Sequence, residues 1–396
     1  MNYIDKLLQG QEVEWRTLGD VVLATSNIRW RDTNKSYRYI DLTSVSREQN
    51  IILETTEITK DNAPSRAQKL VLKDDVIFAT TRPTQQRLCL ITDEYSNEVA
   101  STGYCVLRAN TSVILPKWIF YWIASNEFKI FVEENQSGSA YPAISDAKVK
   151  EFQIPIPFPN DPQKSLAIQQ EIVRVLDSLS EQNKALTTAL AEEIENRKKQ
   201  YAYYREELFR FEGKEVEWKT LGEVASIGTG SHDTKDAVED GIYTFYARGV
   251  NPLKLNSYDF DETAIITAGD GVGVGKVFHW VEGKYALHQR AYKIVPIYDI
   301  NARYIYYYIV TNFLGYVEKQ SVHSSVTSLR KPMFIKFPIA IPSTQEQERI
   351  VRLLDQYDEA AKSIVAAIKK EIELRNKQFE YYRNLLLTFP KLKEVY

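Results

Sequence analysis

The sequence predicts an α+β protein in which two mixed α/β globular domains are joined by two long antiparallel coiled-coil helices. It also predicts an internal pseudo-two-fold repeat. Three observations lead to this prediction: a short motif that occurs twice, a helical block that occurs twice, and a coiled-coil pattern of apolar residues within that block. Segments with short β-type runs separate the repeated blocks.

The repeats have two different offsets. The short motif Gly-x-Glu-Val-Glu-Trp-x-Thr-Leu-Gly starts at Gly10 and returns at Gly213, 203 residues later. The helical block contains Glu-Ile-Glu-x-Arg-x-Lys-Gln, which starts at Glu193 and returns at Glu371, 178 residues later. Because these offsets differ by 25 residues, the repeats form a constant frame and the segments between them vary independently.

Both helical blocks carry apolar or repeat-matched residues at alternating steps of four and three, which is the pattern of a coiled-coil seam. The first helix is expected at about 165–211, and its roughly 47 residues would make it on the order of 70 Å long. Pro390 is expected to end the second helix. The seam positions are Ile172, Leu176, Leu179, Asn183, Leu186 and Leu190 in the first helix and Ile350, Leu354, Tyr357, Ala361, Ile364 and Ile368 in the second.

The intervening segments, about 20–157 and 223–342, are expected to share one mixed α+β fold. Each contains an aromatic helix candidate, at 118–123 and at 304–309, and several short strand candidates. The strand candidates are 37–42, 75–81, 103–108, 242–246, 263–268 and 291–295.

The order of the repeated elements is that of a closed ring cut once. The end of the first helix runs directly into the Gly213 motif, whereas the end of the second helix is followed by the end of the chain. The matching Gly10 motif stands instead at the start of the chain, so we expect the two termini to lie close together. The expected domain boundaries are 1–160 for the first globule (with repeat element 1–22), 161–212 for the first helix, 213–343 for the second globule and 344–396 for the second helix and tail.

The composition, with 44% apolar and 26% charged residues, is that of a soluble globular protein, and the low cysteine content suits a reducing cytoplasm. No stretch is apolar enough to cross a membrane. Cys89 and Cys105 are too few for a disulfide framework and are expected to be half-buried thiols in a reducing compartment. A formal net charge of −3 means that any nucleic-acid surface must be local.

Motifs for catalysis are missing. The glycine-rich stretch 268–277 does not form a phosphate-binding loop, because Asp270 replaces the first required glycine and Val277 replaces the required serine or threonine. A glycine hairpin that brings backbone near a ligand is the favoured interpretation. The histidines and cysteines lack metal-binding spacings, so no metal site is expected.

Candidate DNA contacts combine cationic, amide and aromatic side chains, which suit phosphates and base edges. At each place the alternative is an ordinary solvated loop. Residues 137–141 and 323–325 occupy matching places, and their small hydroxyl side chains could contact phosphate or cap a helix. The candidates are Arg29, Arg31, Arg38, Arg82, Gln85, Arg87 and Tyr141 in the first globule and His232, Arg248, Lys276, His288, Gln289 and Arg290 in the second.

The duplicated helical block, together with the duplicated Gly-x-Glu-Val-Glu-Trp motif, resembles the specificity subunit of type I restriction–modification enzymes over essentially the whole chain. The tract Leu186-Thr-Thr-Ala-Leu-Ala-Glu is similar to the mid-helix tract of the type IC branch.

The resemblance implies a non-catalytic subunit whose globules are target recognition domains, each reading half of a split double-stranded DNA site. The helices would set the spacer and dock two methyltransferase subunits, through which restriction subunits join the complex. It implies no cofactor on this chain, with S-adenosylmethionine, ATP and Mg²⁺ bound by partner subunits. Expected contacts to the methyltransferases are Arg197, Lys199, Arg375 and Lys377. The alternative function is a coiled-coil adaptor that joins two protein-binding modules and has no DNA role. A self-contained methyltransferase or nuclease would have to bind a cofactor itself.

Overall fold

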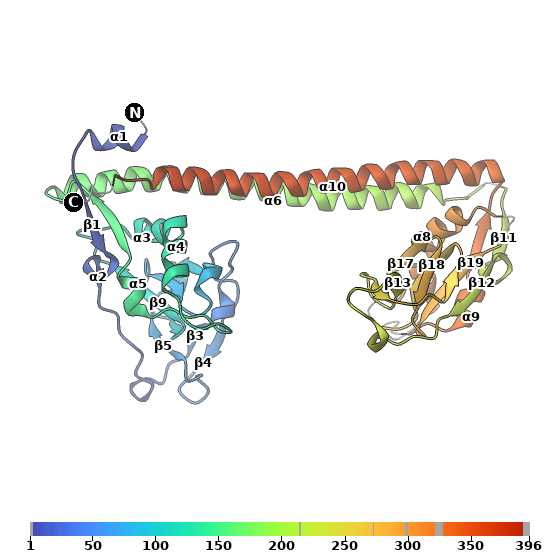
Figure 1. Ribbon diagram of the computed structural model, residues 1–396, viewed down its shortest axis with the longest axis horizontal. Coiled ribbons are helices and arrows are strands. Elements are labelled where there is room, and N and C mark those ends of the chain that lie inside the picture. Colours follow the sequence, from blue (N-terminus) through green and yellow to red (C-terminus); the bar gives the residue numbers. More distant parts are fainter. Residues whose placement is uncertain (1–2, 214, 272, 298–299, 321–327, 391–396) are drawn as a thin grey trace. The chain divides into compact units, whose positions relative to one another are not determined.

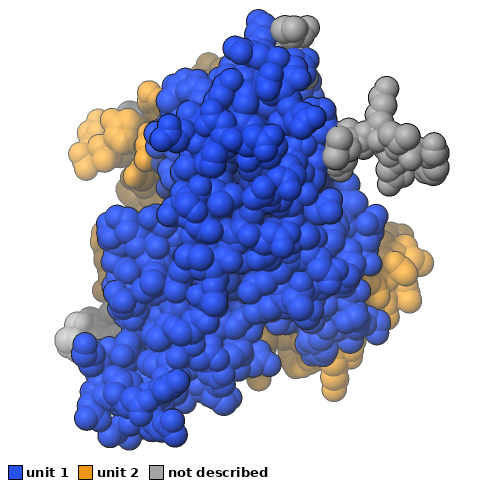
Figure 2. Space-filling model, turned by 90° about the vertical axis from the view of Figure 1, so that its left-hand side faces the viewer, with its two compact units in different colours: residues 1–189, 371–396 blue, residues 190–370 orange. Residues whose placement is uncertain are grey.

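The structure is a computed structural model that describes residues 3–213, 215–271, 273–297, 300–320 and 328–390 (Figure 1). It divides into two compact units, coloured separately in Figure 2. Unit 1 consists of residues 1–189 and 371–396, and unit 2 consists of residues 190–370. Each unit therefore contains one globule, the start of one long helix and the end of the other.

The long helices are α6 (Pro162–Leu208) and α10 (Thr344–Leu386). Helix α6 begins three residues earlier than predicted, at a proline, which suits the first turn of a helix. Within unit 1, the start of α6 packs in one core with the end of α10, and Asn183 farther along α6 donates to Asn376 Oδ1 over 3.0 Å. The two segments therefore run antiparallel there, as predicted. Within unit 2, Tyr204 of α6 stacks on Tyr357 of α10 with ring centroids 5.7 Å apart.

The globule of unit 1 contains two four-stranded sheets, ordered β2-β9-β6-β7 and β4-β3-β8-β5, and the two-stranded ribbon β1-β10. Strands β3 and β8 are parallel, and the other pairs are antiparallel. The strands are β1 Val13–Thr17, β2 Val22–Leu23, β3 Tyr37–Ile40, β4 Thr56–Ile58, β5 Ala67–Leu70, β6 Val76–Ala79, β7 Leu88–Leu90, β8 Val99–Ser101, β9 Tyr104–Ala109 and β10 Gln153–Pro157. The α-helices are α1 Tyr3–Leu8, α2 Leu18–Val21, α3 Pro116–Ile123, α4 Asn126–Asn135 and α5 Asp146–Lys150.

The globule of unit 2 repeats this topology strand for strand. Its sheets are ordered β12-β19-β16-β17 and β14-β13-β18-β15, the second again with one parallel pair, and its ribbon is β11-β20. The prediction that both segments share a fold is confirmed. The strands are β11 Glu217–Thr220, β12 Ala225–Thr229, β13 Tyr243–Tyr246, β14 Leu253–Leu255, β15 Phe260–Asp261, β16 Ala264–Ala268, β17 Phe278–Val281, β18 Lys284–Leu287, β19 Ala291–Pro296 and β20 Pro338–Ile341. The shorter helices are α7 Leu221–Val224, α8 Ala302–Gln320 and α9 Lys331–Ile335.

The duplicated Trp-x-Thr-Leu-Gly motif forms the ribbon strand and the helix turn that follows it. Thr17 and Asp20 form a capping box at the start of α2, with Thr17 N donating to Asp20 Oδ2 over 3.2 Å. Thr220 and Glu223 form the equivalent box at α7. The glycine of the motif allows a close helix contact in unit 2, because a Cβ at Gly222 would lie 2.8 Å from the Ile335 side chain.

The main core of each unit is closed by an aromatic residue just beyond the end of a long helix. In unit 1, the Phe389 ring meets Trp118 of α3 edge-on, with centroids 5.6 Å apart. In unit 2, the Phe209 ring meets Tyr304 of α8 at 5.6 Å in the same way. Trp15 in β1 donates from Nε1 to the carbonyl of Pro390 over 3.1 Å. The start of the described chain therefore lies against its end, which confirms the cut-ring prediction.

Both cysteines are fully buried, rather than half-buried as predicted. Cys105 lies in the core between the sheet of β9 and the helices, and Cys89 lies in a smaller core cluster between the two sheets. Burial raises the pKa of each thiol to about 12, so both remain protonated at neutral pH.

The aromatic closure of unit 1 gives a stability prediction. Phe389→Ala should lower the free energy of unfolding of unit 1 by about 3–5 kcal/mol, because it leaves a cavity against Trp118 and Trp122. Hydrogen exchange read by mass spectrometry in increasing urea should show earlier loss of protection in α3.

The matched control is Phe209→Ala in unit 2. It should move the loss of protection to α8 and leave α3 unchanged. Equal loss of protection in α3 for the two variants would contradict separate cores.

Candidate nucleic-acid interface

In unit 2, loops from both sheets meet at one end of the globule. Strands β13 and β18 are parallel and finish at this end, where His232 pairs in a short bridge with His288 just beyond β18. Arg248 follows β13, Asp270 follows β16, and Arg290 precedes β19. The structure therefore brings together candidates that are far apart in the sequence.

Asp270 lies between two of these candidate arginines. Arg248 Nη1 donates to Asp270 Oδ1 over 2.9 Å, and Arg290 Nη1 donates to Asp270 Oδ2 over 3.1 Å. Burial alone would raise the pKa of Asp270, but the hydrogen bonds from the two arginines outweigh it and lower the pKa. The carboxylate is therefore ionised at neutral pH, and the two cations are held on one anion. Asp270 was not among the predicted contacts.

The neighbouring histidines and glutamine support this loop arrangement. His288 is buried, and its Nδ1 accepts a hydrogen bond from Arg290 N over 2.9 Å. Burial and the nearby Arg248 lower the pKa of His288, which favours the neutral ring. Gln289 Nε2 donates to Asp233 over 3.1 Å, and His232 Nε2 lies 3.1 Å from Asp259 Oδ1. These side chains therefore have protein partners.

The glycine-rich loop of unit 2 carries the exposed Lys276 and packs against the Arg248 loop. A Cβ at Gly273 would lie 2.5 Å from the carbonyl oxygen of Arg248, so glycine is required there. The close approach expected of this hairpin is thus to the main chain of Arg248.

In unit 1, the loop between β6 and β7 carries Arg82, Gln85 and Arg87 at the matching end. Arg82 has a left-handed backbone (φ 49°), donates from N to Pro142 O over 2.7 Å, and places its guanidinium 5.5 Å from the centre of the Tyr141 ring. Tyr141 is 73% exposed, and Gln85 is exposed as well. These three form an accessible cationic, aromatic and amide cluster, whereas Arg87 is only half-exposed.

Arg29 and Arg31 flank an anchored tryptophan. Trp30, in a short 3-10 turn, donates from Nε1 to Ala67 O over 2.9 Å, and its ring meets Tyr37 edge-on. Ala67 pairs with Ser101 at the end of β8, so this turn also lies at the loop end of the globule. The tryptophan is structural, and the two arginines are exposed.

Arg38 lies at the opposite end of β3 from these loops. Its guanidinium contacts Glu94 over 2.9 Å and Glu98 over 3.1 Å and lies 4.6 Å from the centre of the Tyr95 ring. It braces β3 against the segment before β8, away from the other candidates. His323, Ser324 and Ser325 lie outside the described residues.

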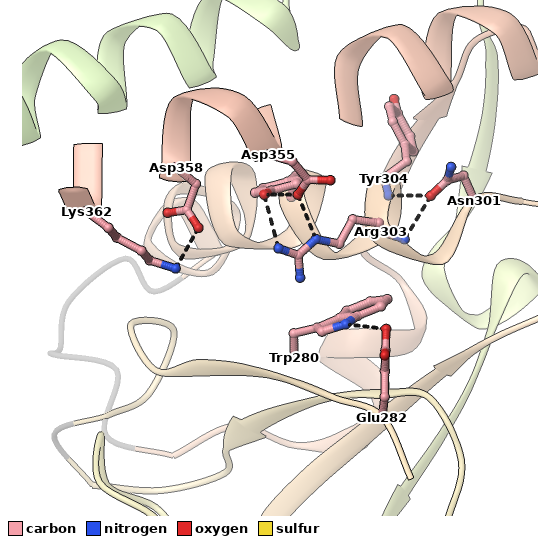
Figure 3. A network of polar contacts seen from close by, with 9 residues as sticks. Trp280, Glu282, Asn301, Arg303, Tyr304, Asp355, Asp358 and Lys362 are labelled. Carbon is pink, nitrogen blue, oxygen red and sulfur yellow. Dashed lines mark hydrogen bonds and ion pairs between the residues drawn. The ribbon is translucent and has the colours of Figure 1, made fainter. Parts of the chain in front are cut away.

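A polar clamp, which the sequence did not predict, joins each globule to its long helix. In unit 2, Arg303 Nε donates to Asp355 Oδ1 over 3.1 Å (Figure 3). Tyr307 OH donates to the same oxygen over 2.6 Å. In unit 1, Tyr121 OH and Lys117 Nζ donate to Asp177, each over 2.7 Å. The available signal was that both aspartates end the repeated Ile-Val-Arg-x-Leu-Asp block.

A buried glutamine accompanies each clamp at repeat-matched positions. Gln169 accepts from Leu115 N over 2.9 Å and donates to Val113 O over 3.0 Å. Gln347 accepts from Asn301 N over 3.1 Å and donates to Pro342 O over 2.9 Å. Both amides join the helix to the loop that leads into α3 or α8.

The paired helix segments leave apolar residues uncovered at matching positions. Leu186 and Ile364, predicted seam residues, are each 40% exposed. A groove of about 260 Å³ in unit 1 is lined in part by Leu179, Phe379 and Tyr382. A groove of about 410 Å³ in unit 2 is lined in part by Tyr201, Ala361 and Val365. Two helices alone do not bury their seam in this part of the chain.

The candidate methyltransferase contacts lie on these helices. Arg197 and Arg375 form identical pairs with Glu193 and Glu371, each over 2.7 Å, and both are partly exposed. Lys377 pairs with Glu373, and Lys199 is exposed.

Within the described ranges there is no metal-binding cluster of histidine, cysteine and acidic residues, and no helix is long and apolar enough to cross a membrane.

The sequence model of one protein family, described as the type I restriction modification DNA specificity domain, matches residues 10–196 and again residues 213–374. The chain belongs to this family. Its two matches coincide with the duplicated frame seen in the structure. The prediction of a type I specificity subunit is thereby confirmed.

Similar proteins agree with membership of the specificity family. The chain is 30% identical over 426 residues to the specificity subunit of the type I restriction enzyme EcoR124I/EcoR124II of Escherichia coli, covering 100% of this chain and 99% of that protein. It is 26% identical to the EcoprrI specificity subunit of Escherichia coli, with 92% of each chain covered.

Two solved structures share the fold. A chain from a study of complex assembly and conformational transition in the type I R-M system superposes with a TM-score of 0.76 at 23% identity, covering 95% of this chain and 97% of that chain. The HsdS subunit of Thermoanaerobacter tengcongensis gives a TM-score of 0.53 at 21% identity, covering 95% and 96%.

The environment of His288 in this specificity subunit predicts a pH effect. Because its folded-state pKa lies below the ordinary value of 6.5, the unfolded chain binds a proton more readily, and unit 2 should lose stability as the pH falls below about 6.5. NMR titration of labelled histidine should give a midpoint below 6.5 for His288. His288→Asn, whose amide oxygen can still accept from Arg290 N, should remove this contribution. A midpoint at or above 6.5 would contradict the burial argument.

Proposed function

We propose that this chain is the DNA-specificity subunit of a type I restriction–modification complex in which each globule reads one half of a split DNA target. The observation that carries the proposal is a duplicated fold with unlike loops. The sheet orders match strand for strand, while the loops at the matching ends carry different exposed cations, amides and aromatic rings. The two half-sites therefore differ in sequence.

The base-reading side chains are arginines, an amide and an aromatic ring that solvent reaches at these loop ends; of these, Arg248 is half-exposed and the others are exposed. In the first target recognition domain, we assign Arg82, Gln85 and Tyr141 to base edges, because arginine and glutamine offer paired hydrogen bonds and the ring can pack against a base. Arg29 and Arg31 are assigned to phosphates. Arg38 and the half-exposed Arg87 are not assigned to DNA contacts.

In the second target recognition domain, we assign Arg248 and Arg290 to base edges and Lys276 to phosphate, since the lysine is exposed beside the Arg248 loop. His288 is buried, and Gln289 and His232 already have protein partners. We assign these three to support of the reading loop.

The helices have two roles in this proposal. Helix α6 is one continuous helix of 47 residues, which suits a spacer between two half-sites. Each unit has a repeat-matched exposed apolar position, Leu186 or Ile364, and a groove along its paired helix segments, which suits one methyltransferase subunit at each. Arg375 lines the groove of unit 1, and Arg197, Lys199 and Lys377 lie on the same two helices. We propose that these four cations pair with acidic groups of the methyltransferases.

Catalysis belongs to partner subunits, in keeping with a non-catalytic specificity family. We propose that S-adenosylmethionine, ATP and Mg²⁺ bind only to those partners, that restriction subunits join through the methyltransferases, and that the complex acts on cytoplasmic DNA.

The mid-helix tract that begins at Leu186 supports assignment to the type IC branch. The near-neutral charge of this chain suits a complex in which methyltransferases supply much of the phosphate contact.

The test is footprinting of random-site duplex DNA by the chain assembled with its methyltransferase. We expect a bipartite protected sequence with a fixed spacer, and weak binding by the isolated chain. Protection without sequence preference would refute DNA reading and favour the adaptor function. S-adenosylmethionine binding by the isolated chain would overturn the assignment of cofactors to partners.

Substitution of one reading arginine should affect one half-site. Arg82→Ala should weaken discrimination in the first half-site by roughly 1–3 kcal/mol if its fork contacts a guanine, while the second half-site stays unchanged. Binding to duplexes with single changes in each half-site measures this. Arg38→Ala is the control from the opposite end of the globule, and an equal effect from it would contradict the assignment.

Lengthening both long helices should increase the spacer between the two half-sites without altering the half-sites themselves. Four residues inserted after Leu186, with four more at the matching place after Ile364, add about one turn, or roughly 6 Å, to each helix. Methylation mapping in a host that carries only this system should show a longer spacer between unchanged half-sites. Altered half-sites would contradict the proposal that the helices set the spacer and the globules read the bases independently.

A further inference from the structure

The Asp270 carboxylate is recessed between two more exposed guanidinium groups. The Asp270 side chain is 24% exposed, whereas those of Arg248 and Arg290 are 39% and 63% exposed. A ligand that approaches this surface therefore meets the arginines before the carboxylate. The bridge carries one net positive charge, because two cations share one anion.

The bridge leaves the reading edge of each arginine available. Both arginines donate to Asp270 through Nη1. Neither Nε nor Nη2 of Arg248 or Arg290 donates to another residue that the structure describes. That edge offers two parallel N–H groups, which match the O6 and N7 acceptors of guanine in the major groove.

The main chain around Asp270 is tied to the loops that carry the arginines. Gly269 N donates to Arg290 O over 2.9 Å, and Asp270 pairs with Ser328 in a short bridge. The glycine loop that follows packs on the carbonyl of Arg248. Both the backbone and the carboxylate therefore limit the directions that the two side chains can take.

The first globule has no carboxylate at the equivalent place. Thr81 pairs with Ala143 in a short bridge that is equivalent to the bridge between Asp270 and Ser328 in the second globule. The neighbouring Arg82 is placed by its main chain and the Tyr141 ring instead. The carboxylate is thus particular to the second reading surface and is not part of the shared frame.

We propose that Asp270 is the positioning residue that sets specificity in the second globule, holding Arg248 and Arg290 with their free edges toward guanines. This inference rests on the proposed function. The carboxylate also lowers the positive charge of the cluster, which weakens contact with phosphate at any sequence. Asp270 therefore lowers the affinity for DNA of any sequence and raises the discrimination between sequences at the second half-site.

The test compares Asp270→Asn with the wild-type chain, each assembled with methyltransferase, on matched and mismatched duplexes over a range of salt. We expect discrimination at the second half-site to fall roughly 10-fold or more, on the scale of one lost bidentate contact. Binding to unrelated DNA should tighten, and its dependence on log salt should steepen by about one unit, because the cluster gains one positive charge.

Two controls separate positioning from charge and from loss of fold. Asp240→Asn removes the same charge from an exposed residue near the start of β13, at the opposite end of that strand, and should leave discrimination unchanged. Arg248→Lys retains the charge but loses the fork, and should reduce discrimination without steepening the salt dependence.

The outcomes also separate this inference from the proposed function. If the wild-type complex selects a bipartite site and Asp270→Asn selects it equally well, the positioning role is wrong and the proposed function stands. Equal weakening on matched and unrelated DNA would likewise overturn the positioning role. A wild-type complex without any preference would refute the proposed function itself.

Discussion

The structure of each unit depends on the attachment of a globule to its long helix. Gln169 and Gln347 lie buried at this junction, and each amide oxygen accepts a hydrogen bond from the loop before the aromatic helix. The Gln169 amide nitrogen also donates to that loop, whereas the Gln347 amide nitrogen donates to Pro342 O in the turn before α10. A buried amide loses its water and requires these partners, so the junction has one favoured arrangement. With the clamps at Asp177 and Asp355, it fixes how the proposed reading loops are placed relative to the helix segment of the same unit.

The same frame carries two different charge arrangements at the proposed DNA-reading surfaces. In unit 1, an arginine with a left-handed backbone packs on an exposed tyrosine ring. In unit 2, two arginines share one recessed carboxylate. Loops at the end of a sheet can differ in this way because the strands and the aromatic core behind them supply the stability. A duplicated protein can therefore recognise two different half-sites.

The sequence predicted which kinds of residue form the candidate site, but not which individual residues belong to it. The sequence indicated arginines, amides and aromatic rings on loops, and most of them do gather at one end of a globule. It could not separate Arg38 from Arg82, because both occur in polar surroundings. Arg38 is engaged by Glu94 and Glu98, about sixty residues away in the chain. Asp270 escaped notice because its only sequence signal was a failed phosphate-loop motif.

The sequence by itself determined the duplicated frame, the long helices, the main strands, the cut-ring order and the family, since each follows from periodicity or repetition within the chain. The tertiary structure alone decided which cations face solvent, that both cysteines are buried, and that Tyr121 and Tyr307 clamp the globules to their helices. The physical reason is distance along the chain. Local patterns report the torsional and apolar preferences of neighbouring residues, whereas the partner of a charged or polar group is selected when the folded chain brings remote segments together.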